Sequence, residues 1–176
     1  AYGAKTIDMS AMSGVTTLNT VNSTGVITVN NAQTATMAVG FAGSSTNSID
    51  LNHAAGKLSG AADVLTANLN TASAVSLVVD PGFESATFNV TGKNDVDTFT
   101  KNGIATVTLA GSGSVDFANT TLDGISTLSA STYTGALTTG TANPTTGFVD
   151  ADIVGATTGA SIILGSGADN IGFTDA

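Results

Sequence analysis

A five-residue phrase recurs in this chain and narrows the folds that it can adopt. Each copy has a glycine, a branched apolar residue, a small residue, a threonine and an apolar residue, at residues 14–18, 103–107 and 124–128. The second and third copies begin 21 positions apart. This spacing is about one complete turn, or rung, of a solenoid, a fold in which each repeat packs only on its neighbours.

Short runs rich in β-branched residues follow one another along the chain, separated by turns rich in Gly, Asn, Ser and Asp. Such runs are typical of strands. The expected strands are residues 16–18, 26–29, 34–39, 48–51, 75–79, 86–90, 104–109, 126–128 and 161–164. The best helical candidate, residues 54–70, has weak apolar periodicity and two internal glycines, so at most a turn or two of helix is expected there.

A second phrase places an aspartate between apolar residues, with copies at residues 7–10, 49–52, 115–118 and 149–152. In a strand this alternation puts the apolar residues on one face and the aspartate on the other. We expect each of these carboxylates to meet water or to bond to a neighbouring turn.

These patterns predict an all-β fold, a parallel β-solenoid of short threonine-rich rungs. Hydrophobic residues make up 41% of the chain but aromatic residues only 5%, so the core has to be thin and repeated along stacked strands. Threonine suits the outer face, because its hydroxyl can form ladders with the same position on adjacent rungs. An immunoglobulin-like β-sandwich is the alternative, since its strand count and turn spacing would be similar.

Residues 1–176 are expected to form a single β-rich segment of a longer exoprotein. The length suits one domain, and residues 1–5 include no apolar stretch suited to a signal peptide. No run approaches the roughly 18 apolar residues of a membrane helix, so no membrane span is expected.

The charged residues are mostly acidic, which bears on the partners of the chain. Twelve Asp and one Glu stand against four Lys and no Arg, for a net charge of −9, so nucleic acid is not an expected partner. An acidic surface favours cations, and aspartates in turns can supply oxygen ligands to calcium. The chain has no cysteine, which excludes disulfides and thiolate metal sites and is compatible with secretion.

One calcium-binding phrase, G-x-G-x-D-x-hydrophobic, lies near the carboxyl end at Gly165, Gly167, Asp169 and Ile171. The glycines would turn the backbone so that carbonyls face the ion, Asp169 would supply charge, and Ile171 would fill the interior. Leu164 stands where a further glycine would precede the phrase, and no tandem copy follows. The sequence therefore predicts either a calcium half-site, at the start of a calcium-repeat region near residues 162–176, or an ordinary glycine turn.

Catalytic signals are weak. His53 is the only histidine, and the chain has no nucleophile elbow, metalloprotease motif or phosphate-binding loop. Beside Ala54 and Ala55, His53 is expected to be a strand-end or turn residue, and the chain is not expected to be an enzyme. Carbohydrate stacking also has little support, because there is no Trp and the phenylalanines are expected to fill the interior.

Three fragments, residues 6–11, 82–92 and 163–171, resemble the surface-layer proteins of Gram-negative bacteria such as Caulobacter and Campylobacter. Those proteins share repeats-in-toxin segments and type I secretion. The resemblance implies an extracellular, calcium-dependent paracrystalline coat at the cell surface, in which copies associate through solenoid edges. It also implies anchoring to lipopolysaccharide by a region not evident in this chain.

Two other functional classes stay open beside a structural surface-layer segment. The first is an adhesin or carbohydrate-binding module of a secreted exoprotein. The second is a polysaccharide-degrading β-helix, which is disfavoured because such sites generally need a strong cation or an acid pair. Here Arg is absent and the four lysines are scattered.

Overall fold

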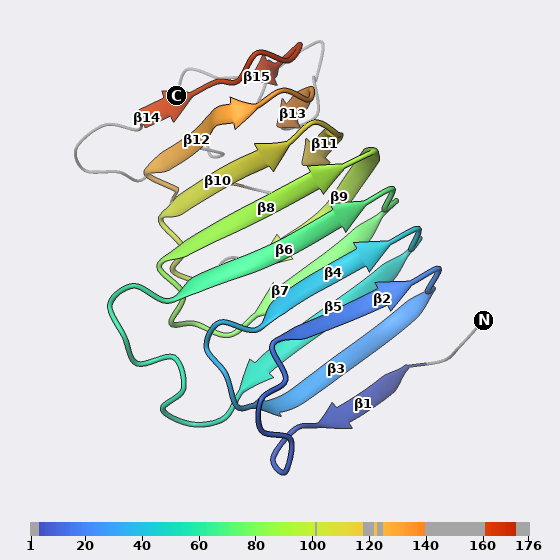
Figure 1. Cartoon of the computed structure of the whole chain (residues 1–176), viewed down its shortest axis with the longest axis vertical. Coiled ribbons are helices and arrows are strands. Elements are labelled where there is room, and N and C mark those ends of the chain that lie inside the picture. The colour runs from blue at the N-terminus through green and yellow to red at the C-terminus, as the bar shows by residue number, and fades with distance from the viewer. Residues whose placement is uncertain (1–3, 101, 118–121, 123–124, 140–160, 172–176) are drawn as a thin grey trace, which may run out of the picture.

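A computed structural model describes residues 4–100, 102–117, 122, 125–139 and 161–171 of the chain, and these residues form strands and turns without a helix (Figure 1). The strands are β1 (Lys5–Asp8), β2 (Thr17–Val21), β3 (Gly25–Ala32), β4 (Ala38–Ala42), β5 (Asn47–His53), β6 (Val64–Asn70), β7 (Val75–Val79), β8 (Ser85–Thr91), β9 (Lys93–Thr100), β10 (Thr106–Gly111), β11 (Ser114–Phe117), β12 (Thr127–Tyr133), β13 (Leu137–Thr139), β14 (Ser161–Ile163) and β15 (Asn170–Ile171).

The strands form a parallel β-solenoid of about six turns. Odd-numbered strands, β1 to β15, make one eight-stranded sheet, and even-numbered strands, β2 to β14, make a seven-stranded sheet. Each strand pairs in parallel with the strand one rung away, and the two sheets face each other across the core (Figure 1). The predicted solenoid is confirmed. The β-sandwich alternative is wrong, because its sheets would be antiparallel.

The recurring five-residue phrase marks the start of a strand in the seven-stranded sheet. Its threonine is the first residue of β2, β10 and β12 in the three copies. Thr106 pairs with Thr127, so the predicted 21-residue spacing is one rung. The phrase begins with glycine because the backbone turns there with positive φ, +79° at Gly14 and +100° at Gly103.

The core lies between the two sheets, and in strands such as β5, β7 and β10 every second residue faces it. Phenylalanines at described positions are buried there, as predicted: Phe41, Phe83, Phe88, Phe99 and Phe117. Phe88 contacts Phe99 and Phe117 edge to face, with ring centroids 5.1 and 5.3 Å apart. Such contacts contribute about 0.5–1.5 kcal/mol each beyond the apolar area that they bury. Both join the seven-stranded sheet to the eight-stranded sheet across the core.

The outer faces carry the polar residues in rows that follow the rungs. On the seven-stranded sheet Thr66, Thr87 and Thr108 are register partners, which places threonine at the same position on three rungs as predicted. Of the aspartates in the second phrase, Asp8, Asp50 and Asp116 lie on the eight-stranded sheet, and the copy at residues 149–152 lies outside the described residues. Asp8 accepts a hydrogen bond from the Asn31 side chain at 3.0 Å and another from a turn N–H, in line with the prediction.

Some expected elements differ in the structure. Residues 34–37 form a turn before β4 instead of the start of a strand. The weak helical prediction for residues 54–70 is wrong, since residues 54–63 form a loop and the remainder is β6. The β9 strand, with its bulge and its three charged residues, is not evident from alternation alone.

Among the described residues, no helix is long and apolar enough to cross a membrane.

Candidate functional site

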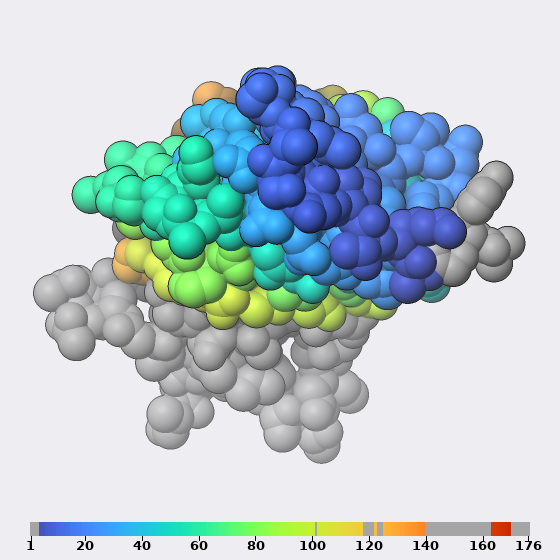
Figure 2. All heavy atoms as spheres, turned by 90° about the horizontal axis from the view of Figure 1, so that it is seen from below, coloured from blue at the N-terminus to red at the C-terminus, as the bar shows by residue number. Residues whose placement is uncertain are grey.

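One connection between the sheets is longer than its neighbours. Residues 33–37 join β3 to β4, and residues 80–84 join β7 to β8, whereas residues 54–63 join β5 to β6. The extra length makes Val39 of β4 pair with Ala67 of β6, 28 positions away, whereas the pairings on either side, β2 with β4 and β6 with β8, advance by 21. This 54–63 loop projects from the side of the solenoid (Figures 1 and 2).

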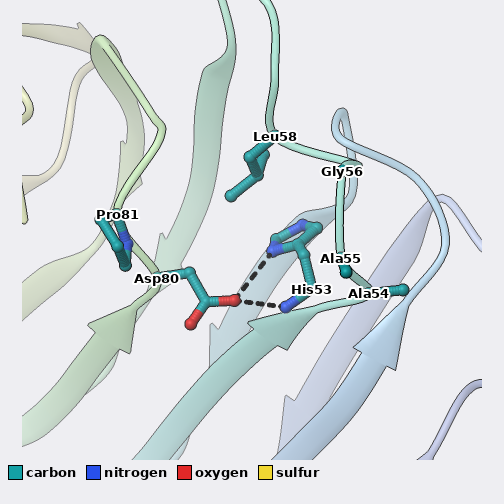
Figure 3. A pocket seen from close by; sticks show the side chains of 7 residues that line it. All are labelled: His53, Ala54, Ala55, Gly56, Leu58, Asp80 and Pro81. Carbon is teal, nitrogen blue, oxygen red and sulfur yellow. Dashed lines mark hydrogen bonds and ion pairs between the residues drawn. The ribbon is translucent and has the colours of Figure 1, made fainter.

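A cavity of about 220 Å³, open to solvent on one side, lies beside the first half of the 54–63 loop (Figure 3). The lining residues come from the end of β5, the first half of the loop and the start of the next connection: His53, Ala54, Ala55, Gly56, Leu58, Asp80 and Pro81. The loop begins with a turn in which the Lys57 N–H donates to the Ala54 carbonyl at 3.1 Å. A Cβ on Gly82 would lie 2.8 Å from Leu58, so glycine lets the two connections pack closely here.

His53 brings an imidazole into this cavity from the last position of β5, as predicted for a strand end. Its register partner in the preceding rung is Ala32, a fully buried core residue. The His53 side chain is only 2% exposed, and its ring contacts Phe83 edge to face at 5.3 Å. A polar ring therefore occupies a position that holds a methyl group one rung earlier.

Asp80 is the acidic partner of His53. Its Oδ2 accepts the backbone N–H of His53 and lies 3.8 Å from the ring Nδ1 (Figure 3). That separation is too long for a hydrogen bond, and neither ring nitrogen has a partner of normal hydrogen-bond geometry. The Asp80 side chain is 28% exposed, so its carboxylate connects the buried ring to the mouth of the cavity.

Burial lowers the pKa of His53 below its ordinary value. The carboxylate of Asp80, the backbone carbonyl of Thr34 and the carboxylate of Asp63 act in the opposite direction but do not overcome burial. The imidazole is therefore neutral at neutral pH, with one nitrogen as donor and the other as acceptor.

The cavity offers groups that can bind a small ligand. A His–Asp pair can activate a nucleophile, but the seven lining residues include no hydroxyl or thiol group. They do provide a carboxylate, a neutral imidazole and apolar walls from Ala54, Leu58 and Pro81. A few polar groups in an apolar pocket are typical of small-ligand sites.

The predicted calcium residues meet at one corner of the solenoid, between β14 and β15. A Cβ on Gly165 would overlap the carbonyl oxygen of Tyr133, and one on Gly167 would overlap that of Gly135. Asp169 Oδ1 accepts the N–H of Leu137 at 3.2 Å. The structure therefore brings Gly165, Gly167 and Asp169 together, with the carboxylate bonded to the rung below.

The same corner recurs in earlier rungs that lack the calcium phrase. Gly135 lies against the carbonyl of Gly113, and Gly113 lies against the backbone of Gly92, with no room for a Cβ at either. Asn94 Oδ1 accepts the N–H of Ala72 at 2.9 Å, and three rungs later in the same row Asp169 accepts the N–H of Leu137. Close stacking of corners thus accounts for the glycines without an ion.

This corner supplies only some of the oxygen ligands that calcium needs. Asp169 supplies one carboxylate, whereas calcium takes about six to eight oxygen ligands. No group of three or more His, Cys, Asp or Glu side chains able to hold a metal occurs in the part of the chain that the structure describes, which ends at residue 171. These residues suit one side of a site whose other ligands would come from a further rung, and the calcium half-site stays a prediction.

A group of aspartates lies on the outer face of the eight-stranded sheet. Asp95 of β9 is the register partner of Asp116 of β11. Burial and then the charges of Asp97 and Asp116 raise the pKa of Asp95 above its ordinary value. These carboxylates make that face acidic.

Sequence reasoning did not single out Asp80. Two signals could have found it: the Asp80-Pro81-Gly82 sequence is typical of a turn, and the ten residues after His53 interrupt the repeat. In a solenoid, a longer connection at one rung is where a site can be added without disturbing the others.

Comparisons with protein-family models, with curated proteins and with solved structures found no match. Any function proposed for the chain therefore has to come from its own residues and geometry.

Proposed function

We propose that the chain is a structural segment of a bacterial surface layer, exported by a type I route and located at the outside of the cell. The observation that carries this proposal is the regular stacking of rungs, in which the main chain pairs in parallel from one rung to the next in both sheets. A fold of this kind makes a rigid extended body whose outer faces repeat at a fixed spacing. Repeated faces are well suited to ordered contact between copies.

Two features of the surface give copies a means to associate. β1 and β2 each have one neighbour among the described strands, and such edges can pair with another strand. The acidic outer face around Asp95 and Asp116 would repel the same face of another copy. Calcium bound between the two faces would remove that repulsion, and Asp169 would add one ligand at its corner.

Light scattering of the purified chain tests this proposal. We expect assemblies in calcium that dissociate on addition of a chelator, with magnesium at equal ionic strength as the control. Assembly and stability that do not respond to calcium would remove the ion from the proposal. A chain that stays monomeric over the accessible concentrations in both conditions would remove self-assembly.

Two substitutions separate the corner from the ion. Asp169→Asn keeps an acceptor for the Leu137 N–H but loses charge, so it should weaken only the calcium response. Gly167→Ala would place a Cβ on the Gly135 carbonyl and should destabilise the chain with or without calcium. Lipopolysaccharide binding by other regions of a longer protein would complete the anchoring.

The alternative is an adhesin or carbohydrate-binding module, and one observation favours it. The outer face of the seven-stranded sheet carries rows of threonine with Asn68 and Asn89, whose amides bond to each other at 2.9 Å. Such rows offer many donors and acceptors to sugar hydroxyls, although Tyr133 is buried and cannot stack on a ring. Specific binding of the monomer on a glycan array would support this function over the first.

A further inference from the structure

The cavity beneath the 54–63 loop is a local departure from the repeat and not a by-product of it. It exists because this connection is longer than those at residues 33–37 and 80–84, and because His53 stands where the preceding rung has Ala32. Both changes act at the same place. We infer that this cavity binds a small organic cation, a protonated primary amine carried on a short hydrocarbon chain.

The charge of the site favours a cation. Asp80 lines the cavity, and Asp63, from the far end of the same loop, also acts electrostatically on His53. The one lysine of the loop, Lys57, is exposed and does not line the cavity. An ammonium group would therefore meet a carboxylate without a competing positive charge on the cavity wall.

His53 supplies the second observation. Its side chain is 98% removed from solvent, lines the cavity and has no hydrogen-bond partner at either ring nitrogen. A neutral imidazole has one nitrogen lone pair that can accept a hydrogen bond. Nδ1 lies 3.8 Å from Asp80 Oδ2, a span that one ammonium group with three donors can bridge. Both ring nitrogens are closed to solvent, so the ammonium group binds Asp80 at the mouth of the cavity and reaches Nδ1 only through a small shift of the ring.

The remaining walls select the rest of the ligand. Ala54, Ala55, Leu58 and Pro81 are apolar and suit methylene groups. The cavity, at about 220 Å³, is smaller than the roughly 300–1,000 Å³ typical of drug-sized ligands. It therefore fits a short alkyl chain and not a folded partner or a large sugar.

A metal ion fits the site less well than an amine. Zinc and similar ions take about four ligands, usually at least three from the protein. The lining residues offer one imidazole and one carboxylate. An ammonium ion needs only hydrogen-bond acceptors, which these two groups provide.

The only histidine of the chain gives a direct readout. In a ¹H–¹³C spectrum the ring signals of His53 need no assignment, so they can be followed while butylammonium is added at neutral pH. We expect a saturable shift with butylammonium and none with 1-butanol, which has a similar shape without the charge. The same titration is repeated with Nα-acetyl-lysine amide. A shift with this compound as well would extend the ligand class to lysine side chains.

Variants separate the site from general attraction to an acidic protein. Asp80→Asn keeps an acceptor for the His53 backbone N–H but should weaken butylammonium binding about tenfold or more. Asp50→Asn removes the same charge from the outer face of β5 and should leave binding unchanged. His53→Ala should fold, because Ala32 fills this position one rung earlier, and should weaken binding several-fold when followed by the Ala54 and Ala55 methyl signals.

Three results would overturn the inference. The first is the absence of a saturable shift with butylammonium. The second is equal weakening by Asp80→Asn and Asp50→Asn, which would mean that the amine follows the net charge of the chain. The third is a shift with zinc or calcium ions but not with the amine, which would make the cavity a metal site.

Discussion

Replacing His53 with phenylalanine should stabilise the ligand-free protein. Both imidazole nitrogens are buried and lack hydrogen-bond partners of normal geometry, although the Thr34 carbonyl and the Asp80 carboxylate act on the ring. A buried unsatisfied polar group destabilises the folded state by about 1–3 kcal/mol. Phenylalanine removes both nitrogens and keeps the edge-to-face contact with Phe83, and the adjoining cavity has room for its slightly larger ring.

The expected gain is about 1–3 kcal/mol in the free energy of unfolding at neutral pH. This gain counts the cost of burying the imidazole once and not once for each nitrogen. The Asp80 carboxylate, 3.8 Å from Nδ1, offsets part of that cost. His53→Ala is the variant with which this gain is compared. It also removes the nitrogens but loses the ring contact, which contributes about 0.5–1.5 kcal/mol, so its gain should be smaller.

The gain should increase as the pH falls. The pKa of His53 is lower in the folded protein than its unfolded value of about 6.5, so the unfolded chain binds the proton first. Wild-type stability therefore falls as the pH drops through about 6.5 towards the folded pKa, by at most about 1.4 kcal/mol per pH unit. The phenylalanine variant lacks this titration, so the difference between the two proteins isolates it from the aspartates.

Urea denaturation followed by far-ultraviolet circular dichroism measures both quantities, because the fold is all strand in the described residues and the chain has no Trp. The measurements should be made at about pH 7 and about pH 5. A phenylalanine variant less stable than wild type at neutral pH would contradict the absence of partners for the ring. A difference that does not change between the two pH values would contradict the lowered pKa.

Three further predictions concern other parts of the solenoid. Gly135→Ala should destabilise by about 3 kcal/mol or more in urea, because its Cβ would overlap the Gly113 carbonyl, whereas Gly14→Ala, with open space and positive φ, should lose about 1–2 kcal/mol. Asp95→Asn should raise the free energy of unfolding by less than about 1 kcal/mol at neutral pH. The pKa of Asp95 is raised in the folded protein, so its ionised carboxylate destabilises the fold at pH values above that pKa. In urea titrations this gain should vanish below about pH 4 and shrink in high salt. Tyr133→Phe should lower the free energy of unfolding by about 1–2 kcal/mol, because the buried hydroxyl donates to the Gly113 carbonyl. Burial raises the pKa of Tyr133 to about 12, so tyrosinate absorbance of the wild type should show one group titrating there.

Much of the fold could be predicted because solenoid physics acts locally. Residues 75–79 alternate between buried and outward positions, and the same residues form β7. The 21-residue spacing of residues 103–107 and 124–128 reflects the register between β10 and β12. Alternation alone could not separate a solenoid from a sandwich, however, because it is the same in parallel and antiparallel strands. The sequence signal for parallel pairing is a regular spacing of the strands, and the 54–63 loop interrupts that spacing.

The candidate site was only half visible in the sequence. His53 could be placed at a strand end, but its burial depends on β-pairing with Ala32 and on the loop that covers it. Asp80 is 27 positions away, which is one rung plus the extra length of the loop. A search at the regular spacing of 21 or 22 would therefore have missed the pair. Contacts in a solenoid are predictable from the sequence only after the length of each rung is known.

Glycine spacing in such a chain says more about the corner than about the ion. At residues 113, 135 and 167 the glycines meet the backbone of the neighbouring rung, and of these only Gly167 belongs to the calcium phrase. Asn94, which has no charge, makes the same kind of backbone hydrogen bond as Asp169. A calcium repeat and an ion-free corner therefore share the glycines and the hydrogen bond. What distinguishes them is a second set of oxygen ligands on the next rung, so tandem copies, and not the G-x-G-x-D pattern alone, indicate a calcium site in a solenoid of this kind.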